Sequence, residues 1–332
     1  MNGAGLDVVA IGNALVDVLS HETYEFLDVQ ELTAGAMTLI DTERAESLYA
    51  AMGPAVEISG GSAANTLVGI TSLGGSAAFV GRVADDELGT VFGHDIRAAG
   101  VDFRAKAVAG GEPSGRCLII VTPDAQRTMN TYLGASAQLG PADIDRDLVV
   151  RAQVLYLEGY LWDEPEAKAA YRLAARAAHE GGNRVAFTLS DSFCVDRHRK
   201  EFRELVETEV DILFANEAEI TSLYEVDDFD DALQQVQHHC EVAALTRSEH
   251  GAVIVARDEV HVVDAHPVAS VVDTTGAGDQ FAAGFLYGFT HGYDLGTAAR
   301  LGTLAAAEVI SHLGARPSVS LAALAAPVLD GR

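Results

Sequence analysis

Short apolar runs and longer amphipathic runs alternate along the chain. The short runs are rich in β-branched residues and apolar at nearly every position, which is typical of strands buried on both faces. This order predicts an α/β fold, with a doubly wound, mostly parallel sheet covered by helices on both faces. The expected strands are 6–11, 77–81, 115–121, 127–133, 153–158, 184–189, 211–215, 242–246 and 252–256. The expected helices are 62–73, 85–99, 164–180, 194–208, 216–225, 229–240, 277–291 and 295–312.

Two segments interrupt this alternation. Residues 14–59 show no clear covering helix, and residues 103–135 contain two strands joined at 122–125, where Thr-Pro-Asp-Ala is typical of a turn. Strands joined so briefly must be antiparallel. We therefore expect both segments to form a small inserted β-sheet lid on a single domain that spans 1–332. The tail at 315–332 is expected to be a covering helix or loop.

The charge of the chain limits its partners. Among 332 residues, 48% are hydrophobic, which excludes a disordered chain. The net charge is −27 with only three lysines, and a field of that sign repels the phosphate backbone of nucleic acids. An anionic ligand must therefore be held by local groups, such as backbone N–H groups, a few arginines or a metal ion.

Cysteine spacing and the absence of export signals indicate a compartment. Cys117, Cys194 and Cys240 lie far apart and form no CxxC pair. The start of the chain lacks the pattern of a signal peptide, and no apolar run approaches the ~20 residues of a membrane span. We expect a cytoplasmic protein that binds neither membranes nor nucleic acid.

The sharpest motif is DTTGAGD at 273–279, which leads into a predicted helix. Gly276, Ala277 and Gly278 let the backbone approach a ligand, and the helix N-terminus directs its N–H groups and positive dipole end there. The motif therefore predicts an anion hole. Asp279 can either cap this helix or accept a proton from a bound hydroxyl. The glycine pair upstream favours the second role, because a cap does not require it.

A second glycine cluster, SGGSAANT, precedes the helix expected at 62–73. Gly60 and Gly61 allow close backbone approach to hydroxyl groups, and Ser62 and Asn65 add polar side chains. The alternative is a tight turn with Ser62 as the N-cap.

Polar residues also follow the first strand. Asn13 and Asp17 lie near its carboxyl edge, where open α/β sheets bind ligands. Asn13 offers a donor and an acceptor and Asp17 offers acceptors only, so together they can bind vicinal hydroxyls. A simple turn is the alternative.

Two later strands end in similar polar segments. Asn216 can N-cap the following helix, with Glu219 in the capping-box position, or Glu219 can hold water around Mg²⁺. Thr246, Ser248 and Gly251 follow the strand at 242–246 and form either a nucleotide contact or a polar turn.

Patterns of other enzyme classes are missing from the sequence. It contains no HExxH motif, so its histidines are expected to be surface or structural residues and not zinc ligands. It also contains no GxSxG elbow and no Walker A lysine, which argues against α/β-hydrolases and P-loop enzymes. The segment after the first strand is not GxGxxG, which argues against an NAD-dependent oxidoreductase.

Taken together, these stretches resemble the ribokinase-like (PfkB) family of carbohydrate and nucleoside kinases. GGSAANTLVGITSLGG at 60–75 and DTTGAGDQFAAGFLYG at 273–288 are similar to its two signatures. NEAE at 216–219 matches its NxxE element, and GARPSV at 314–319 is similar to its closing segment. The resemblance implies transfer of the γ-phosphoryl group of ATP to a primary alcohol. It places Asp279 at the catalytic base and 276–278 at the anion hole.

The same resemblance implies nucleotide and metal sites. Asn216 corresponds to a residue near the phosphates, and Glu219 to one that orders Mg²⁺ through water. Thr246, Ser248 and Gly251 correspond to the nucleotide turn, where many members have glycine in place of Ser248. In many members Asp273 and Thr275 also donate carbonyl oxygens to a K⁺ ion.

The resemblance narrows the substrate. The spacing of Asn13 and Asp17, together with GGSxxN at 60–65, resembles adenosine kinases more than ribokinases, which implies phosphorylation of a ribonucleoside 5′-hydroxyl. Tyr160 and Trp162 can stack on the base, or they can pack in the lid or core. A sugar kinase of the same family and a non-catalytic sugar or nucleotide sensor are the alternatives. The lid strands can close over a monomer or pair in a homodimer.

Overall fold

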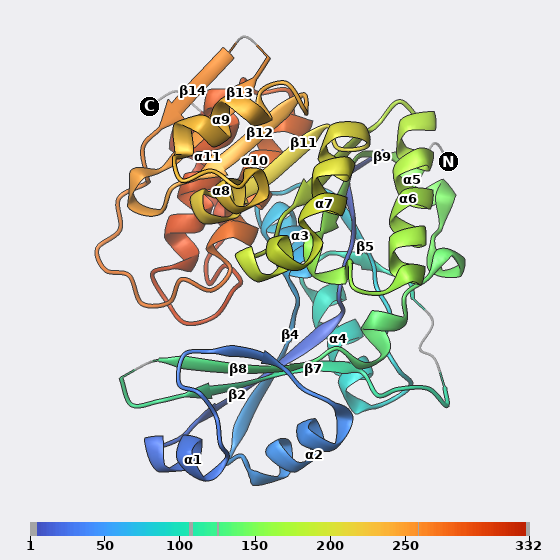
Figure 1. The fold of residues 1–332 in the computed structure, drawn as a ribbon, viewed down its shortest axis with the longest axis vertical. Coiled ribbons are helices and arrows are strands. Elements are labelled where there is room, and N and C mark those ends of the chain that lie inside the picture. The colour runs from blue at the N-terminus through green and yellow to red at the C-terminus, as the bar shows by residue number, and fades with distance from the viewer. Residues whose placement is uncertain (1–4, 106–108, 125, 258, 330–332) are drawn as a thin grey trace.

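The structure is a computed structural model that describes residues 5–105, 109–124, 126–257 and 259–329. Two sheets organise these residues, and Figure 1 shows the smaller sheet below the main body. Across these four ranges, every helix is too short or too polar to cross a membrane. Ala125, the last residue of the predicted turn, lies outside the described residues.

The larger sheet carries the main core. Its spatial order is β14 (Glu259–Val263), β13 (Ala252–Ala256), β12 (Val242–Thr246), β11 (Ile212–Asn216), β10 (Arg184–Thr188), β9 (Ala152–Glu158), β1 (Leu6–Ile11), β5 (Ala77–Val80) and β6 (Asp102–Phe103). The strands from β6 to β12 are parallel, which confirms the predicted doubly wound, mostly parallel sheet. β13 and β14 are antiparallel to their neighbours because their links are too short for a crossover. The regular parallel alternation therefore ends at β12.

Helices cover both faces of this sheet. One face packs against α5 (Arg146–Arg151), α6 (Pro165–Glu180), α7 (Ser192–Thr208), α8 (Glu217–Tyr224) and α9 (Phe229–Val236). The other packs against α3 (Ser62–Ser72), α4 (Glu87–Ala98), α10 (Ala277–Thr290) and α11 (Leu295–Val309). The tail forms α12 (Leu321–Leu329), which packs against α11 and α3.

The smaller sheet has the order β3 (Met37–Leu39), β8 (Arg127–Tyr132), β7 (Gly115–Val121), β2 (Leu15–His21) and β4 (Ala55–Gly60). β7 and β8 pair antiparallel, as predicted. Figure 1 shows α1 (Tyr24–Val29) and α2 (Thr42–Ala51) on the side of this sheet away from the main body.

The expectation that 14–59 lacks a covering helix is wrong, since α1 and α2 both lie there. Each begins at an N-cap that the sequence contains: Thr23 accepts from the Phe26 N–H, and Asp41 accepts from the Arg44 N–H. The short links 12–14 and 61 join this sheet directly to β1 and α3. The candidate residues around these links are therefore brought to the junction of the two sheets.

Candidate active site

Asp279 lies in the first turn of α10 but does not cap it. The N-cap is Gly276, whose φ of +79° favours glycine, and a Cβ there would lie 2.7 Å from Ala315. The Asp279 carboxylate points across to α3 instead. Its Oδ1 accepts from Ser62 Oγ at 2.7 Å, and its Oδ2 accepts from Asn65 Nδ2 at 3.3 Å. The capping alternative for Asp279 therefore does not describe the structure.

The environment of Asp279 suits a proton acceptor near neutral pH. Burial raises the pKa of Asp279 to about 6, against the opposing effect of its two hydrogen-bond donors and of Arg316. A base with a pKa just below neutral is mostly ionised at pH 7 and still takes up a proton readily.

The turn before Asp279 presents backbone donors. Among the described residues, the N–H groups of Gly276, Gly278 and Asp279 donate to no protein acceptor, whereas that of Ala277 donates to the Thr274 carbonyl at 3.2 Å. A Cβ on Gly278 would meet nothing within 4 Å, so the space beside it is open. Free N–H groups at a helix N-terminus bind anions.

The second glycine cluster, Gly60 and Gly61, precedes α3, the helix that faces Asp279. Gly61, with φ of +93°, is the N-cap of α3, so the alternative in which Ser62 is the cap is wrong. A Cβ on Gly61 would collide with the Asn13 carbonyl oxygen, and a Cβ on Gly60 would lie 2.5 Å from the Asp17 carboxyl carbon. Both glycines are therefore needed for close packing of this loop.

Asp17 stands on β2 with its carboxylate over Gly60. No hydrogen bond to Asp17 side-chain oxygens occurs among the described residues. Burial raises the pKa of Asp17 to about 6, although Arg316 and Arg127 lower it and Asp279 raises it further. Its oxygens thus remain free to accept hydrogen bonds from a ligand, close to Asp279.

Asn13 is engaged by protein groups. Its Nδ2 and backbone N–H both donate to Glu158 Oε1, at 2.9 and 2.8 Å, and its Oδ1 accepts from Ser136 at 2.9 Å. Glu158 Oε2 also accepts from the Ala63 N–H at 2.8 Å. Burial raises the pKa of Glu158 to about 7. Asn13 therefore fixes the loops around the site, and only its second Nδ2 hydrogen is left for a hydroxyl.

Two arginines complete the polar network. Arg316 donates through Nε to Asn65 Oδ1 at 3.0 Å and through Nη1 to Ser59 Oγ at 2.6 Å. Arg127, on β8, pairs with Asp273 and donates to Thr275 Oγ1 at 2.7 Å. The Arg127 guanidinium therefore holds the side chains of Asp273 and Thr275. That their backbone carbonyl oxygens bind K⁺ stays a prediction.

Asn216 and Glu219 form the capping box at the start of α8. Asn216 Oδ1 accepts from the Glu219 N–H at 2.9 Å, and Glu219 accepts from the Asn216 backbone and side chain at 3.0 and 2.6 Å. Burial raises the pKa of Glu219 to about 7, and the charge of Asp191 raises it further. The buried Glu219 carboxylate and the half-buried Asp191 place two negative charges close together, which suits a nearby cation.

The predicted nucleotide turn lies beside this box. Thr246 pairs with Asn216 across β12 and β11. Ser248 adopts φ of +51°, in the left-handed region that glycine favours. The backbone therefore forms this turn although a serine stands there. A Cβ on Gly251 would collide with the Val263 carbonyl oxygen, which explains glycine at that position.

The two aromatic candidates differ. Trp162 is fully buried, packs against Tyr171 and Phe202, and donates through Nε1 to Glu201 at 2.9 Å. A ring without an exposed face cannot stack on a ligand, so its position does not fit the predicted stacking and matches the core-packing alternative. Tyr160 is half-buried, with its hydroxyl donating to the Ser190 carbonyl at 3.2 Å.

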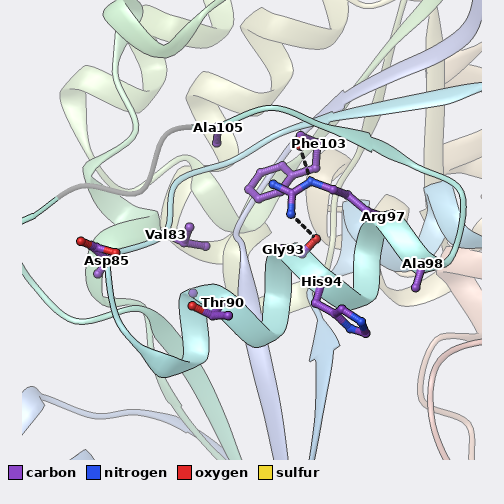
Figure 2. A pocket seen from close by; sticks show the side chains of 11 residues that line it. Val83, Asp85, Thr90, Gly93, His94, Arg97, Ala98, Phe103 and Ala105 are labelled. Atoms are coloured by element: carbon purple, nitrogen blue, oxygen red, sulfur yellow. Dashed lines mark hydrogen bonds between the residues drawn. The ribbon is translucent and has the colours of Figure 1, made fainter.

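A cavity of about 590 Å³ lies elsewhere, along α4 (Figure 2). Its lining includes Val83, His94 and Phe103 and none of the predicted site residues. Arg97 closes one side by donating to the Gly93 and Phe103 carbonyl oxygens at 2.7 and 2.9 Å. This cavity is therefore not part of the candidate active site.

Three charged residues of this network were not predicted from the sequence: Glu158, Arg127 and Arg316. Glu158 is a carboxylate at the end of an apolar strand, which is a usable signal because buried carboxylates need partners. Arg316 lies within the closing segment at 314–319, but nothing in its spacing shows that it reaches α3. Arg127 gives no sequence signal.

Comparisons with known proteins agree with this geometry. Residues 8–322 match the family described as pfkB family carbohydrate kinase. The crystal structure of adenosine kinase from Sinorhizobium meliloti is 53% identical, with a TM-score of 0.91, and the match covers 97% of this chain and 99% of that one. A probable sugar kinase protein from Rhizobium etli CFN 42 is 51% identical, with a TM-score of 0.92 and 99% of each chain covered. An ATP-dependent ribose-1-phosphate kinase from Halopiger xanaduensis is 29% identical over 90% of this chain and 97% of its own length.

Proposed function

Because the chain belongs to the pfkB family of carbohydrate kinases, we propose that it moves the γ-phosphoryl group of ATP to the 5′-hydroxyl of a ribonucleoside such as adenosine. Membership makes it a phosphotransferase with an alcohol as acceptor. The identity of the alcohol is the part that we propose.

The observation that carries the proposal is the Asp279 carboxylate, held by Ser62 and Asn65 beside free backbone N–H groups. Asp279 takes the proton of the acceptor hydroxyl as its oxygen attacks the γ-phosphorus. The bond from that phosphorus to the bridging oxygen breaks, and ADP leaves with the electron pair. The N–H groups of Gly276 and Gly278 stabilise the charge on the transferring group. The proton then passes from Asp279 to solvent.

The smaller sheet supports a nucleoside acceptor. Because side chains alternate along a strand, Leu19 shares the sheet face of Asp17, and the register places Cys117 beside Asp17 and Ile119 beside Leu19. Cys117 and Ile119 belong to a small buried apolar cluster on β7, and the partly buried side chains of Leu19 and Met129 pack against it. A carboxylate next to an apolar strip suits a ligand with ribose hydroxyls at one end and a flat base at the other. The adenosine kinase from Sinorhizobium meliloti adds support.

Mg²⁺ fits the residues at the start of α8, beside the proposed nucleotide turn after β12. The described residues contain no group of three metal-ligating side chains, which suits an ion held through water and phosphate oxygens. Glu219 and Asp191 would hold it, and the ion would offset the charge of the phosphates there. We propose Thr246, Ser248 and Gly251 as the neighbouring nucleotide contacts.

A sugar acceptor is the second candidate, because the Rhizobium etli protein at 51% identity is described as a probable sugar kinase. The deciding experiment measures kcat/KM with MgATP for adenosine, inosine, guanosine, ribose and fructose. We expect a nucleoside to give the highest value. A pentose or hexose that exceeds every nucleoside contradicts the nucleoside proposal and leaves the kinase assignment intact.

A further inference from the structure

We propose that Arg316 is a positioning residue for the base, which acts on Asp279 through the side-chain amide of Asn65. The proposal rests on the proposed function, since it takes Asp279 as the proton acceptor. Arg316 lies in the segment after α11 and touches neither the 276–278 turn nor the Asp279 carboxylate by a hydrogen bond.

The contacts form one chain of donors and acceptors. Arg316 Nε donates to Asn65 Oδ1 at 3.0 Å, and Asn65 Nδ2 donates to Asp279 Oδ2 at 3.3 Å. A guanidinium can only donate, so the amide oxygen must face Arg316 and the amide nitrogen must face Asp279. Arg316 therefore fixes the one orientation in which Asn65 stabilises the ionised carboxylate.

The backbone around Arg316 is anchored on both sides. Gln280 is fully buried, and its Nε2 donates to the carbonyl oxygens of Asn65 and Ala315 at 3.0 and 3.1 Å. Beyond Arg316, Ser318 donates through its N–H and hydroxyl to Glu308 at 2.9 and 2.8 Å. The guanidinium is therefore presented from a fixed segment and not from a free loop.

The charge of Arg316 also acts on the base directly. Burial lowers the pKa of Arg316 to about 10, so it stays protonated at neutral pH, with Asp17, Asp95 and Asp279 as the nearby charges that oppose the shift. Its positive charge lowers the pKa of Asp279, which burial raises.

Other titratable groups face the base from several elements and set the background for this effect. They comprise Asp17 on β2, Tyr156 and Glu158 on β9 and Tyr160 after it, which all sense the charge of Asp279, together with Arg127 on β8, which acts on Asp17.

The test is the pH dependence of kcat/KM for the best acceptor with MgATP, in wild type, Arg316→Gln and Arg316→Lys. In Arg316→Gln we expect the acid limb of the pH profile of kcat/KM to move by about one unit toward higher pH. The loss of kcat/KM relative to wild type should then be about five-fold larger at pH 6 than at pH 8. In Arg316→Lys we expect the limb to return toward wild type while kcat stays reduced, because lysine supplies the charge but not the planar fork.

The matched control is Arg97→Gln, since Arg97 also donates through Nε and Nη1 to protein oxygens but lies at the other cavity (Figure 2). It should lower the melting temperature without moving the limb. If Arg316→Gln does not fold, Asn65→Ala provides the second variant. It removes the hydrogen bond through which Arg316 acts and which itself lowers the pKa of Asp279, so kcat should fall and the limb should move at least as far toward higher pH. An unshifted limb in Asn65→Ala overturns the proposal as well.

An unshifted limb in Arg316→Gln, or a loss of the same size at every pH, overturns the proposal and makes Arg316 a structural residue only. A shifted limb that lysine does not restore overturns the role of its charge. Failure of the proposed function is distinguishable, because it appears as normal turnover in Asp279→Asn.

Discussion

Asp279 and Asp17 are two half-buried aspartates of one site, and burial raises the pKa of each to about 6. They differ in what holds them. Both oxygens of Asp279 accept hydrogen bonds from α3, whereas the Asp17 carboxylate has no protein donor among the described residues. A carboxylate fixed by donors suits one defined proton transfer, and a carboxylate with free acceptors suits recognition of hydroxyls. This contrast is the basis on which we propose catalysis for Asp279 and substrate recognition for Asp17.

The largest expected effect comes from Asp279→Asn. The variant keeps the size of the side chain but removes the proton acceptor, so kcat should fall about 10²–10⁴-fold while the acceptor dissociation constant changes little. Steady-state kinetics and calorimetric binding measure the two quantities. Near-normal turnover in the folded variant would show that Asp279 is not the base.

Gly60→Ala tests the other aspartate without changing its charge. The new Cβ would lie 2.5 Å from the Asp17 carboxyl carbon and must displace it, so kcat/KM should fall about 10–100-fold. Gly140→Ala is the control, because a Cβ there meets nothing closer than 3.6 Å. Equal activity of the two variants contradicts the role of Asp17.

Glu219→Gln sharpens the contrast with a third carboxylate that we assign to Mg²⁺. The Mg²⁺ concentration for half-maximal rate should rise about ten-fold, as expected when a residue that orients bound waters is lost. Glu225→Gln, on the exposed end of α8, should leave it unchanged. Activity that persists in excess EDTA would contradict any need for a divalent cation.

The smallest expected effect concerns stability. The pKa of Asp17 is higher in the folded chain than in the unfolded one, so the carboxyl favours folding below about pH 4, and this contribution is lost as the pH rises through about 6. Asp17→Asn cannot ionise, so it should raise the melting temperature at pH 8 by about 2–4 °C and give no gain near pH 4. Thermal melts at the two pH values measure this. Asp28→Asn, on the exposed face of α1, serves as the control, and an equal gain in both variants contradicts the account.

The sequence predicted the regular part of the fold well. The limits expected for the strands at 6–11, 115–121, 242–246 and 252–256 are those of β1, β7, β12 and β13, because apolar runs bounded by turn residues define them. The short helices α1 and α2 escaped prediction, since their apolar periodicity is weak and only their caps mark them.

The candidate site was predicted in its motifs but not in its connections. Asp279, Ser62 and Asn65 were each singled out, yet their mutual contacts join positions more than 200 residues apart. The same holds for Arg316, which reaches back to Asn65 from the closing segment. Periodicity and spacing report only local structure, so contacts of this kind become visible only in three dimensions.

The most direct test of the division between the two aspartates is the ratio of kcat/KM for adenosine to that for 2′-deoxyadenosine, in wild type, Asp17→Ala and Asp279→Asn. A site built to bind a hydroxyl penalises the analogue that lacks it, because its own polar groups are left unpaired. We therefore expect wild type to prefer adenosine strongly, Asp17→Ala to lose that preference, and Asp279→Asn to keep it at a much lower rate. A preference that survives in Asp17→Ala, or one that disappears in Asp279→Asn, would contradict the assignment of recognition to one aspartate and catalysis to the other.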